Sequence, residues 1–144
     1  MNAADAKAII DAVTDWANNR EDIRALALVG SWARGNSHPA SDLDILLLSD
    51  SAADYRHGAW LTEVAFESAG FHLQSHQAVT YGVVWSEHLQ LEPDAEVELT
   101  FAKCSWANVD PIDNGTRQVV NDGLHIIFDR DRVLTKLIDA AMSG

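Results

Sequence analysis

The chain has 144 residues, of which 47% are hydrophobic and 22% are charged, a composition typical of a globular domain that buries its own core. Ten Lys and Arg stand against 22 Asp and Glu, and the net charge of −12 argues against long DNA or RNA as a partner, because most of the surface repels a phosphate backbone. The single Cys104 excludes an intramolecular disulfide and a cysteine-based zinc site. The sequence shows neither a signal peptide nor an apolar run near the ~20 residues that span a bilayer. We therefore expect a cytoplasmic protein with no membrane segment.

The first half of the chain alternates helical and extended patterns. Apolar residues at every third or fourth position mark the helices, and short continuous apolar runs mark buried strands. The predicted elements are a helix over about 4–18, a strand over 23–29, one helical turn over 31–35, a strand over 42–48 and a helix over 52–69 that stops at Gly70.

The second half is richer in β-branched and aromatic residues. Residues 96–101 alternate strictly, so that Glu96 and Glu98 share one face of a strand and the apolar residues between them share the other. The predicted elements are one or two strands in 71–85, a turn at 92–95, a strand over 96–101, an irregular segment over 106–115, a short helix over about 116–121, a strand over 124–128 and a helix over 132–141. The alternation of helices and apolar strands predicts an α/β fold in which helices pack on a mixed sheet.

Two carboxylates, Asp42 and Asp44, stand at the entrance to the second apolar strand. Residues two apart in a strand project to the same side, so the two carboxylates lie close together on one side of the strand. Like charges this close repel unless a cation lies between them, and a hard divalent ion such as Mg²⁺ takes carboxylate oxygens. Alternatively, the two residues serve only as cap and turn residues at the start of the strand.

Gly30 and Ser31 follow the first apolar strand directly. A glycine at this point lets backbone amides approach an anion closely, and the serine adds a hydroxyl donor. The alternative is that Gly30 ends the strand and Ser31 caps a helical turn. Arg34 lies one helical turn further on and either reaches a phosphate oxygen or pairs with an acidic neighbour on the surface.

The joined pattern, GSWARG followed by SDLDILLL between two apolar strands, resembles the nucleotidyltransferase superfamily that includes DNA polymerase beta. It looks especially like minimal bacterial nucleotidyltransferase domains and is also similar to the corresponding segment of aminoglycoside nucleotidyltransferases. The resemblance covers about residues 20–105, which implies one nucleotidyltransferase-like domain over 1–144 with that core and a C-terminal strand and helix extension at 106–144.

The resemblance also implies roles for individual residues. Gly30 and Ser31 would hold the β- and γ-phosphates of a nucleoside triphosphate, and Asp42 and Asp44 would ligate two Mg²⁺ ions. The superfamily uses a third carboxylate on an adjacent strand, for which Glu98 is the choice over its neighbour because it lies nearer the middle of the strand. Glu98 would ligate metal, act as general base, or both; the alternative is that it belongs to the solvated face of an edge strand.

The activity that follows is Mg²⁺-dependent transfer of a nucleoside monophosphate, AMP from ATP by preference, to a hydroxyl of a small molecule or protein, with release of pyrophosphate. One alternative is an antitoxin-type protein adenylyltransferase that modifies a helical toxin partner. Another is a nucleotide-binding module that has lost catalysis, and a third is a protein-interaction domain with no nucleotide site. A second copy or a partner protein is expected to complete the acceptor pocket of so compact a transferase.

The remaining histidines and tryptophans point to no separate site. The six His residues show no metal-ligand spacing, and His38, in the loop between the two motifs, is expected to be solvated. Trp16 and Trp60 fit core positions of helices. For the other three tryptophans core packing is favoured, and flanking the site is the alternative; these are Trp32, Trp85 and Trp106.

Overall fold

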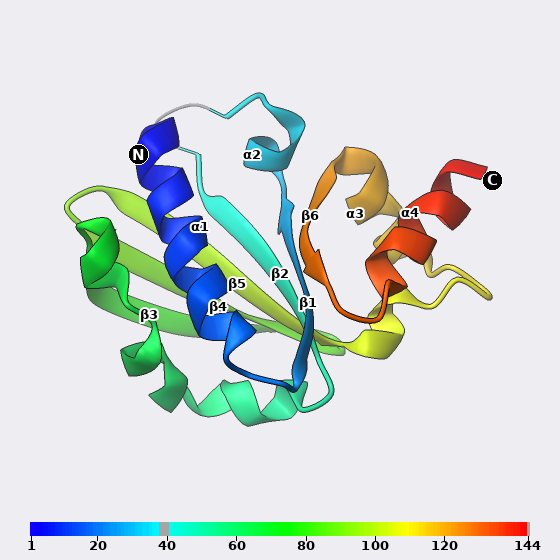
Figure 1. Cartoon of the computed structure of the whole chain (residues 1–144), viewed down its shortest axis with the longest axis horizontal. Helices are drawn as coiled ribbons and strands as arrows, with labels where there is room; N and C mark the ends of the chain where they lie inside the picture. The colour runs from blue at the N-terminus through cyan, green and yellow to red at the C-terminus, as the bar shows by residue number, and fades with distance from the viewer. Residues whose placement is uncertain (38–40, 144) are drawn as a thin grey trace.

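A six-stranded mixed sheet organises the molecule (Figure 1), and the computed structural model describes residues 1–37 and 41–143. The strands lie in the order β3-β4-β5-β2-β1-β6. Strands β2 and β5 are parallel, and the other neighbouring pairs are antiparallel. The predicted α/β class with a mixed sheet is confirmed. The strands are β1 (Ile23–Val29), β2 (Leu43–Ser49), β3 (His72–Tyr81), β4 (Val84–Glu92), β5 (Ala95–Lys103) and β6 (Leu124–Asp129).

Helices and short 3₁₀ segments connect these strands and cover the sheet. Helix α1 begins with a capping box between Asn2 and Asp5, and it buries Ile9, Val13 and Trp16 against the sheet. The helices are α1 (Ala3–Asn18), α2 (Ser31–Arg34), α3 (Asn114–Asp122) and α4 (Val133–Ser143), and the 3₁₀ segments are η1 (Ala52–His57), η2 (Ala59–Glu63), η3 (Phe66–Ala69) and η4 (Cys104–Ala107).

The predicted helix over 52–69 is wrong, because this segment forms three separate 3₁₀ turns. Gly58 adopts a left-handed conformation with φ 71°, and Val64 is extended, so the chain turns away from a helical path twice. Apart from proline, glycine is the poorest helix former. The turns bury Tyr55 and Trp60 together, and the Trp60 indole donates a hydrogen bond to the Tyr55 carbonyl at 2.6 Å.

The two faces of the sheet carry two apolar clusters. The first cluster joins alternate residues of β2 and β5, such as Ile45 and Leu99, to α1 and the 3₁₀ segments. The second cluster joins Leu46 and other buried apolar residues on the opposite face of β1, β2 and β5 to Leu134 and Leu137 of α4. Since side chains alternate along a strand, Asp44 and Glu98 project from the second face, on the same side as α4.

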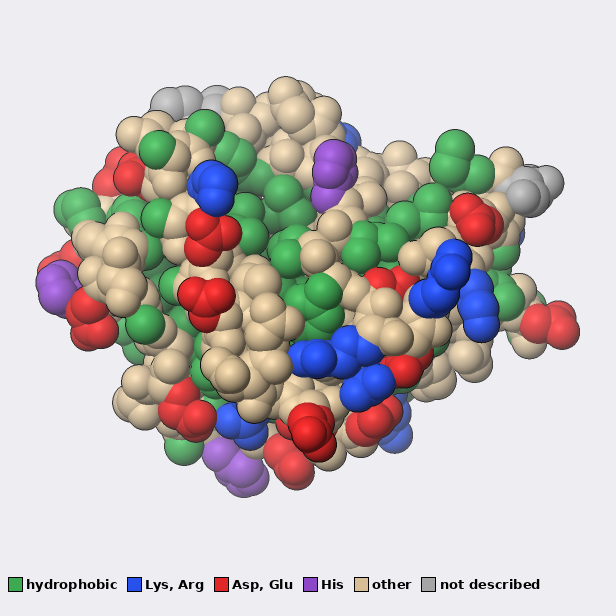
Figure 2. All heavy atoms as spheres, in the orientation of Figure 1, with side chains coloured by type: hydrophobic (Ala, Val, Ile, Leu, Met, Phe, Trp, Pro, Cys, Tyr) green, Lys and Arg blue, Asp and Glu red, His purple; other side chains and the backbone are tan. Residues whose placement is uncertain are grey.

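The first apolar cluster extends to β6, where its side chains are only partly buried. Figure 2 shows apolar side chains between α1 and the C-terminal helices, in the region where Figure 1 places β1 and β6. From these two strands, the partly buried Leu28, Ile127 and Phe128 pack against the cluster. Over the described part of the chain, no helix is both long enough and apolar enough to cross a membrane.

Candidate active site

Asp44 and Glu98 lie directly opposite each other across the parallel pair β2–β5. The same row continues across the sheet to His88 on β4 and Gln77 on β3, and in the other direction to Val29 on β1. The row therefore joins β2, which carries the Asp-x-Asp motif, to β5, whose alternating pattern led to the prediction of Glu98. The sequence prediction paired these carboxylates, and the register places them as neighbours.

Asp44 occupies an environment that disfavours its charge. Burial, together with the negative charges of Glu98 and Asp42, raises the pKa of Asp44 to about 7. Its Oδ1 atom is buried and, within the described residues, accepts no hydrogen bond. A buried carboxylate oxygen without a partner is costly, so this position calls for a positively charged ligand.

Asp42 and Glu96 form a second carboxylate pair beside the first. Asp42 is exposed and precedes β2. A hydrogen bond that the protonated Glu96 carboxyl donates to the Asp42 carboxylate, followed by the charge of Asp42, raises the pKa of Glu96. The four acidic side chains thus form two pairs, Asp42 with Glu96 and Asp44 with Glu98, and the paired residues Leu43 and Val97 lie between them along the strands. The sequence prediction left Glu96 out of the site, and the structure brings it against Asp42.

The backbone of Gly30 lies close to the Asp44 carboxylate. It has φ 76° and ψ −156°, a conformation that residues with a side chain rarely adopt, and a Cβ placed there would lie 2.5 Å from Asp44 Oδ2. The glycine therefore makes room for the carboxylate. This contact was missed by sequence reasoning, which related Gly30 to phosphate binding or to the end of the strand, although a glycine next to a strand end indicates close backbone approach in general.

Ser31 and Arg34 begin and end the single turn of α2. Arg34 is exposed, and its guanidinium Nη1 donates to the carbonyl of Asp122 at 3.4 Å, at the end of α3. A pocket of about 230 Å³ lies between these elements, and it is lined by residues that include Gly30, Arg34, Asp44 and Glu98. Gly30 and Arg34 of the motif loop (residues 30–35) thus open on the same space as Asp44 and Glu98, whereas Ser31 and Asp42 do not line it.

A second pocket, of about 380 Å³, lies on the other side of the carboxylates. Most of its lining residues are polar or acidic, the apolar ones being Leu89 and Val97, and they come from β3, β4 and β5 together with Asp42. His88 reaches from β4 toward Glu98, with 3.4 Å between Nε2 and Oε1. The polar lining residues that sequence reasoning missed are Ser75, His76, Gln77, His88 and Gln90. Only strand pairing relates them to Glu98, although the alternation within β4 marks His88 and Gln90 as one face.

The carboxylate set has the chemistry that a divalent cation requires. Asp44 supplies a buried oxygen with no hydrogen-bond partner among the described residues, and its neighbours supply like charges that a cation would relieve. Among the described residues, no three His, Cys, Asp or Glu side chains are already gathered closely enough to hold a metal ion. Binding would therefore need the carboxylates of Asp42, Asp44 and Glu98 to rotate toward a common point.

The tryptophans and His38 have different outcomes. Trp85 is 2% exposed and stacks on Phe101 in the core, so it does not flank the site. Trp16 and Trp60 are buried, as predicted. The last two are partly buried against the two clusters, Trp32 against the first and Trp106 against the second. His38 lies outside the described residues.

Cys104 behaves as a structural cysteine. Its thiol is partly buried and donates to an Asp50 carboxylate oxygen at 3.4 Å. Burial and this carboxylate raise the pKa of the thiol to about 11, so the reactive thiolate is disfavoured near neutral pH. The cysteine therefore takes no part in the site.

Comparison with known proteins agrees with this geometry. The family model of the nucleotidyltransferase domain matches residues 11–114. The fold is similar to the crystal structure of an aminoglycoside 6-adenyltransferase from Bacillus subtilis, with a TM-score of 0.56 and 18% sequence identity. The match covers 91% of this chain and 42% of that chain, so this chain spans less than half the length of that relative. No curated protein matches the chain. Because the family model spans more than half of the 144 residues, the chain belongs to the nucleotidyltransferase domain family.

Proposed function

We propose that the chain transfers the nucleoside monophosphate of a nucleoside triphosphate, AMP from ATP, to a hydroxyl of a small polar acceptor. The single observation that carries the proposal is the pair of Asp44 and Glu98, in which a buried carboxylate oxygen of Asp44 has no hydrogen-bond partner in the described part of the chain and lies beside a like charge. Such an arrangement is unfavourable without a cation and suits one that arrives with phosphates.

The triphosphate is assigned to the motif loop. Backbone N–H groups at the start of α2 and the Ser31 hydroxyl would bind the β- and γ-phosphates, beside the glycine that approaches Asp44. Arg34 lines the same pocket and would donate to a phosphate oxygen when a nucleotide is present. Its bond to the Asp122 carbonyl would orient it for this contact.

The carboxylates divide the chemical work. Asp42, Asp44 and Glu98 would hold two Mg²⁺ ions, which would neutralise charge on the entering and leaving oxygens. Glu98 borders both pockets, and its carboxylate would accept the proton of the acceptor hydroxyl. His88 lies against that carboxylate and would orient it.

The direction of attack assigns the acceptor. In an in-line displacement the entering oxygen and the leaving pyrophosphate lie on opposite sides of the α-phosphorus. The Gly30 end of β1 lies on one side of the pair of Asp44 and Glu98, and the pocket of about 380 Å³ over β4 and β3 lies on the other. We therefore assign the acceptor to that pocket.

The lining of the acceptor pocket favours a polar molecule without phosphate groups. It contains carboxylates, carboxamides, a hydroxyl and imidazoles, and none of its lining residues is Lys or Arg. Such a lining donates and accepts hydrogen bonds with hydroxyl groups and attracts amines. The acceptor of the similar Bacillus subtilis enzyme, an aminoglycoside by its name, has these properties, and we extend only that class of chemistry to this chain.

Incubation with ATP labelled at the α-phosphate tests the proposal. The full chain is mixed with Mg²⁺ and a panel of amino sugars and other polyols, with a protein lysate as a separate arm. Label transfer by wild type, its loss in Asp44→Asn and its retention in Asp54→Asn would support the proposal. Equal transfer by wild type and Asp44→Asn would overturn it, and label on protein alone would favour the antitoxin-type alternative. Binding of Mg²⁺ and ATP with no transfer to any arm would identify an inactive binding module.

A further inference from the structure

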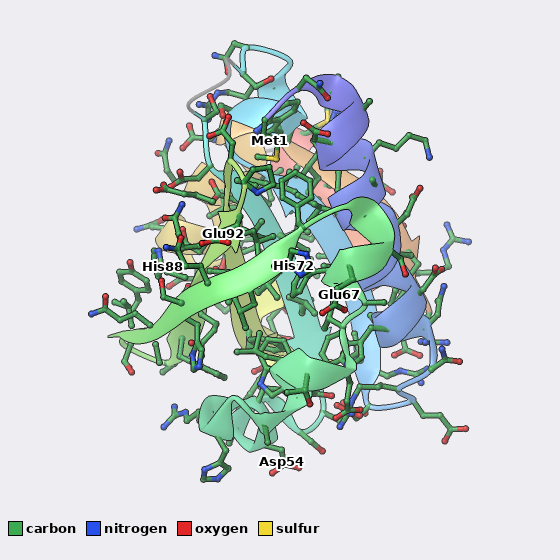
Figure 3. The ribbon with its side chains drawn as sticks, turned by 90° about the vertical axis from the view of Figure 1, so that its left-hand side faces the viewer. Met1, Asp54, Glu67, His72, His88 and Glu92 are labelled. Atoms are coloured by element: carbon green, nitrogen blue, oxygen red, sulfur yellow. The ribbon has the colours of Figure 1, made fainter. Side chains whose placement is uncertain are left out.

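Strand β3 forms an open edge of the sheet. It has ten residues, nearly all of them exposed, and it pairs only with β4. From Ser75 to Tyr81 its register with β4 is continuous. In Figure 3, β3 crosses the front of the view, and the labelled His88 lies on the strand beside it. The outer edge of such a strand offers N–H and C=O groups to which another strand can add.

This edge carries no charged side chain. Residues 68–86, which include all of β3, contain no Asp, Glu, Lys or Arg, whereas the chain as a whole has a net charge of −12. Edge strands of monomers are usually protected by Lys, Pro or a bulge. In β3 the only such device is the register shift between Leu73 and Ser75, near its start.

The opposite edge of the sheet, β6, is shorter than β3 and carries charged residues at its end. Strand β6 has six residues, ends at Asp129 and is followed directly by Arg130, Asp131 and Arg132. Two copies of an acidic protein repel each other over most of their surfaces, and charged residues at the end of β6 interrupt any added strand. Of the two edge strands, β3 is therefore the one that can pair with a second copy of this acidic chain.

We propose that two copies of the chain associate by antiparallel pairing of their β3 strands across a twofold axis. The pairing that uses the whole continuous segment is centred on Ala78, which then faces Ala78 of the second copy. Gln77 faces Val79, His76 faces Thr80 and Ser75 faces Tyr81. Every pair combines uncharged or imidazole side chains, so a self-complementary interface forms without like charges in opposition.

The association also bears on the acceptor pocket, and this consequence rests on the proposed function. Ser75 and Gln77 line the pocket, which ends at the β3 edge. Tyr81 is 51% exposed in one copy. In the pair, Tyr81 of the second copy lies beside Ser75 and adds an aromatic side chain to the wall of the pocket.

Sedimentation equilibrium of the full chain tests the association without any nucleotide, so its outcome is independent of transfer activity. The chain has a mass of 15.8 kDa, and the pair has twice that mass. The test variant is Ala78→Lys, which sets two positive charges opposite each other in the pair and leaves Glu87 beside each lysine on β4. The matched control is His125→Lys, which adds the same charge at an exposed position of the other edge strand.

We expect wild type and His125→Lys to reach twice the single-chain mass at about 100 µM, and Ala78→Lys to remain at the single-chain mass. Circular dichroism checks that each variant folds, and Thr80→Lys replaces Ala78→Lys if the latter does not fold. Single-chain mass for wild type at this concentration would overturn the proposal. So would association of the β3 variants as strong as that of wild type, which would place the contact elsewhere.

Discussion

Asp44 and Glu98 face each other across the parallel strands β2 and β5, one row from the point where the chain leaves β1 at Gly30. Backbone register, and not a salt bridge between side chains, holds the two carboxylates together. Strands β2 and β5 also supply buried residues on both faces of the sheet, so the separation of the two Cα atoms is fixed by the core. The like charges are therefore a built feature that a bound cation relieves.

Replacing Gly30 by alanine should displace Asp44. A Cβ at this position would lie 2.5 Å from the Asp44 carboxylate, in addition to the backbone strain of a positive φ, which costs about 1–3 kcal/mol. We expect loss of transfer activity and of Mg²⁺-induced thermal stabilisation. Gly35→Ala is the matched control, because Gly35 also has a positive φ, at 75°, with no atom within 4 Å of the added methyl.

The Gly35→Ala variant should lose about 1–2 kcal/mol of stability and keep its response to Mg²⁺. Thermal melts with and without Mg²⁺ measure both effects. If the two glycine variants lose the Mg²⁺ response equally, the contact between Gly30 and Asp44 is not what matters.

Asp44→Asn should leave the metal-free protein as stable as wild type or more stable. The substitution removes a negative charge that is buried beside Glu98 and close to Asp42. The same change should abolish stabilisation by Mg²⁺ and lower transfer by about 10²-fold or more. Urea unfolding in the presence of a chelator gives the first quantity. A large loss of stability in metal-free Asp44→Asn, with none in the exposed Asp54→Asn, would show that Asp44 stabilises the fold instead.

The two glutamates of β5 should differ in function. Glu98 is in register with Asp44 and borders both pockets, whereas Glu96 is exposed and contacts Asp42. We expect Glu98→Gln to lower kcat by about 10²–10⁴-fold, the usual contribution of a general base. Glu96→Gln should instead raise the KM for the acceptor and leave kcat near that of wild type. Steady-state kinetics separate the two, and a reversal of the pattern would make Glu96 the third catalytic carboxylate.

Asp22 should make stability depend on pH in the acid range. Burial acts to raise the pKa of Asp22, but hydrogen bonds from Tyr55 and Ser49 and the charge of Arg20 outweigh it and hold the pKa below its usual value. The ionised group therefore stabilises the fold above about pH 4, and this contribution disappears as pH falls through the lower folded-state pKa.

The corresponding measurement is the free energy of unfolding of wild type and Asp22→Asn at pH 7 and near pH 3. Wild type should be the more stable at pH 7, and the difference should shrink in acid. A difference that stays constant, or grows, as pH falls would contradict the assigned hydrogen bonds.

Much of the fold follows from local patterns in the sequence. The strand at Ile23–Val29 and the helix that buries Ile9 and Val13 lie where the apolar spacing predicts them, because each element owes its burial to its own residues. The segment 52–69 does not follow its pattern. Its apolar residues fit a helix, but Gly58 and the packing of Tyr55 on Phe101 favour separate turns. Tertiary packing determines the conformation of this segment, and the local sequence pattern does not reveal that packing.

The site divides in the same way. The motif loop, Asp42 and Asp44 are contiguous, and alternation alone places Glu98 on a common face with Glu96. What alternation leaves out is register between strands far apart in the sequence, which sets Glu98 opposite Asp44 and brings His88 and Gln77 into the same row. The contact of Gly30 with Asp44 likewise depends on the antiparallel pairing of β1 with β2.

A crystal of the full chain soaked with Mn²⁺ and a non-hydrolysable ATP analogue would show whether the motif loop and the three carboxylates form one site. We expect anomalous Mn²⁺ peaks bound by Asp42, Asp44 and Glu98. We also expect the β- and γ-phosphates against Gly30 and Ser31, and the α-phosphate turned toward the pocket lined by His88 and Gln90. Mn²⁺ bound away from these three carboxylates, or phosphates bound away from the motif loop, would contradict this assignment.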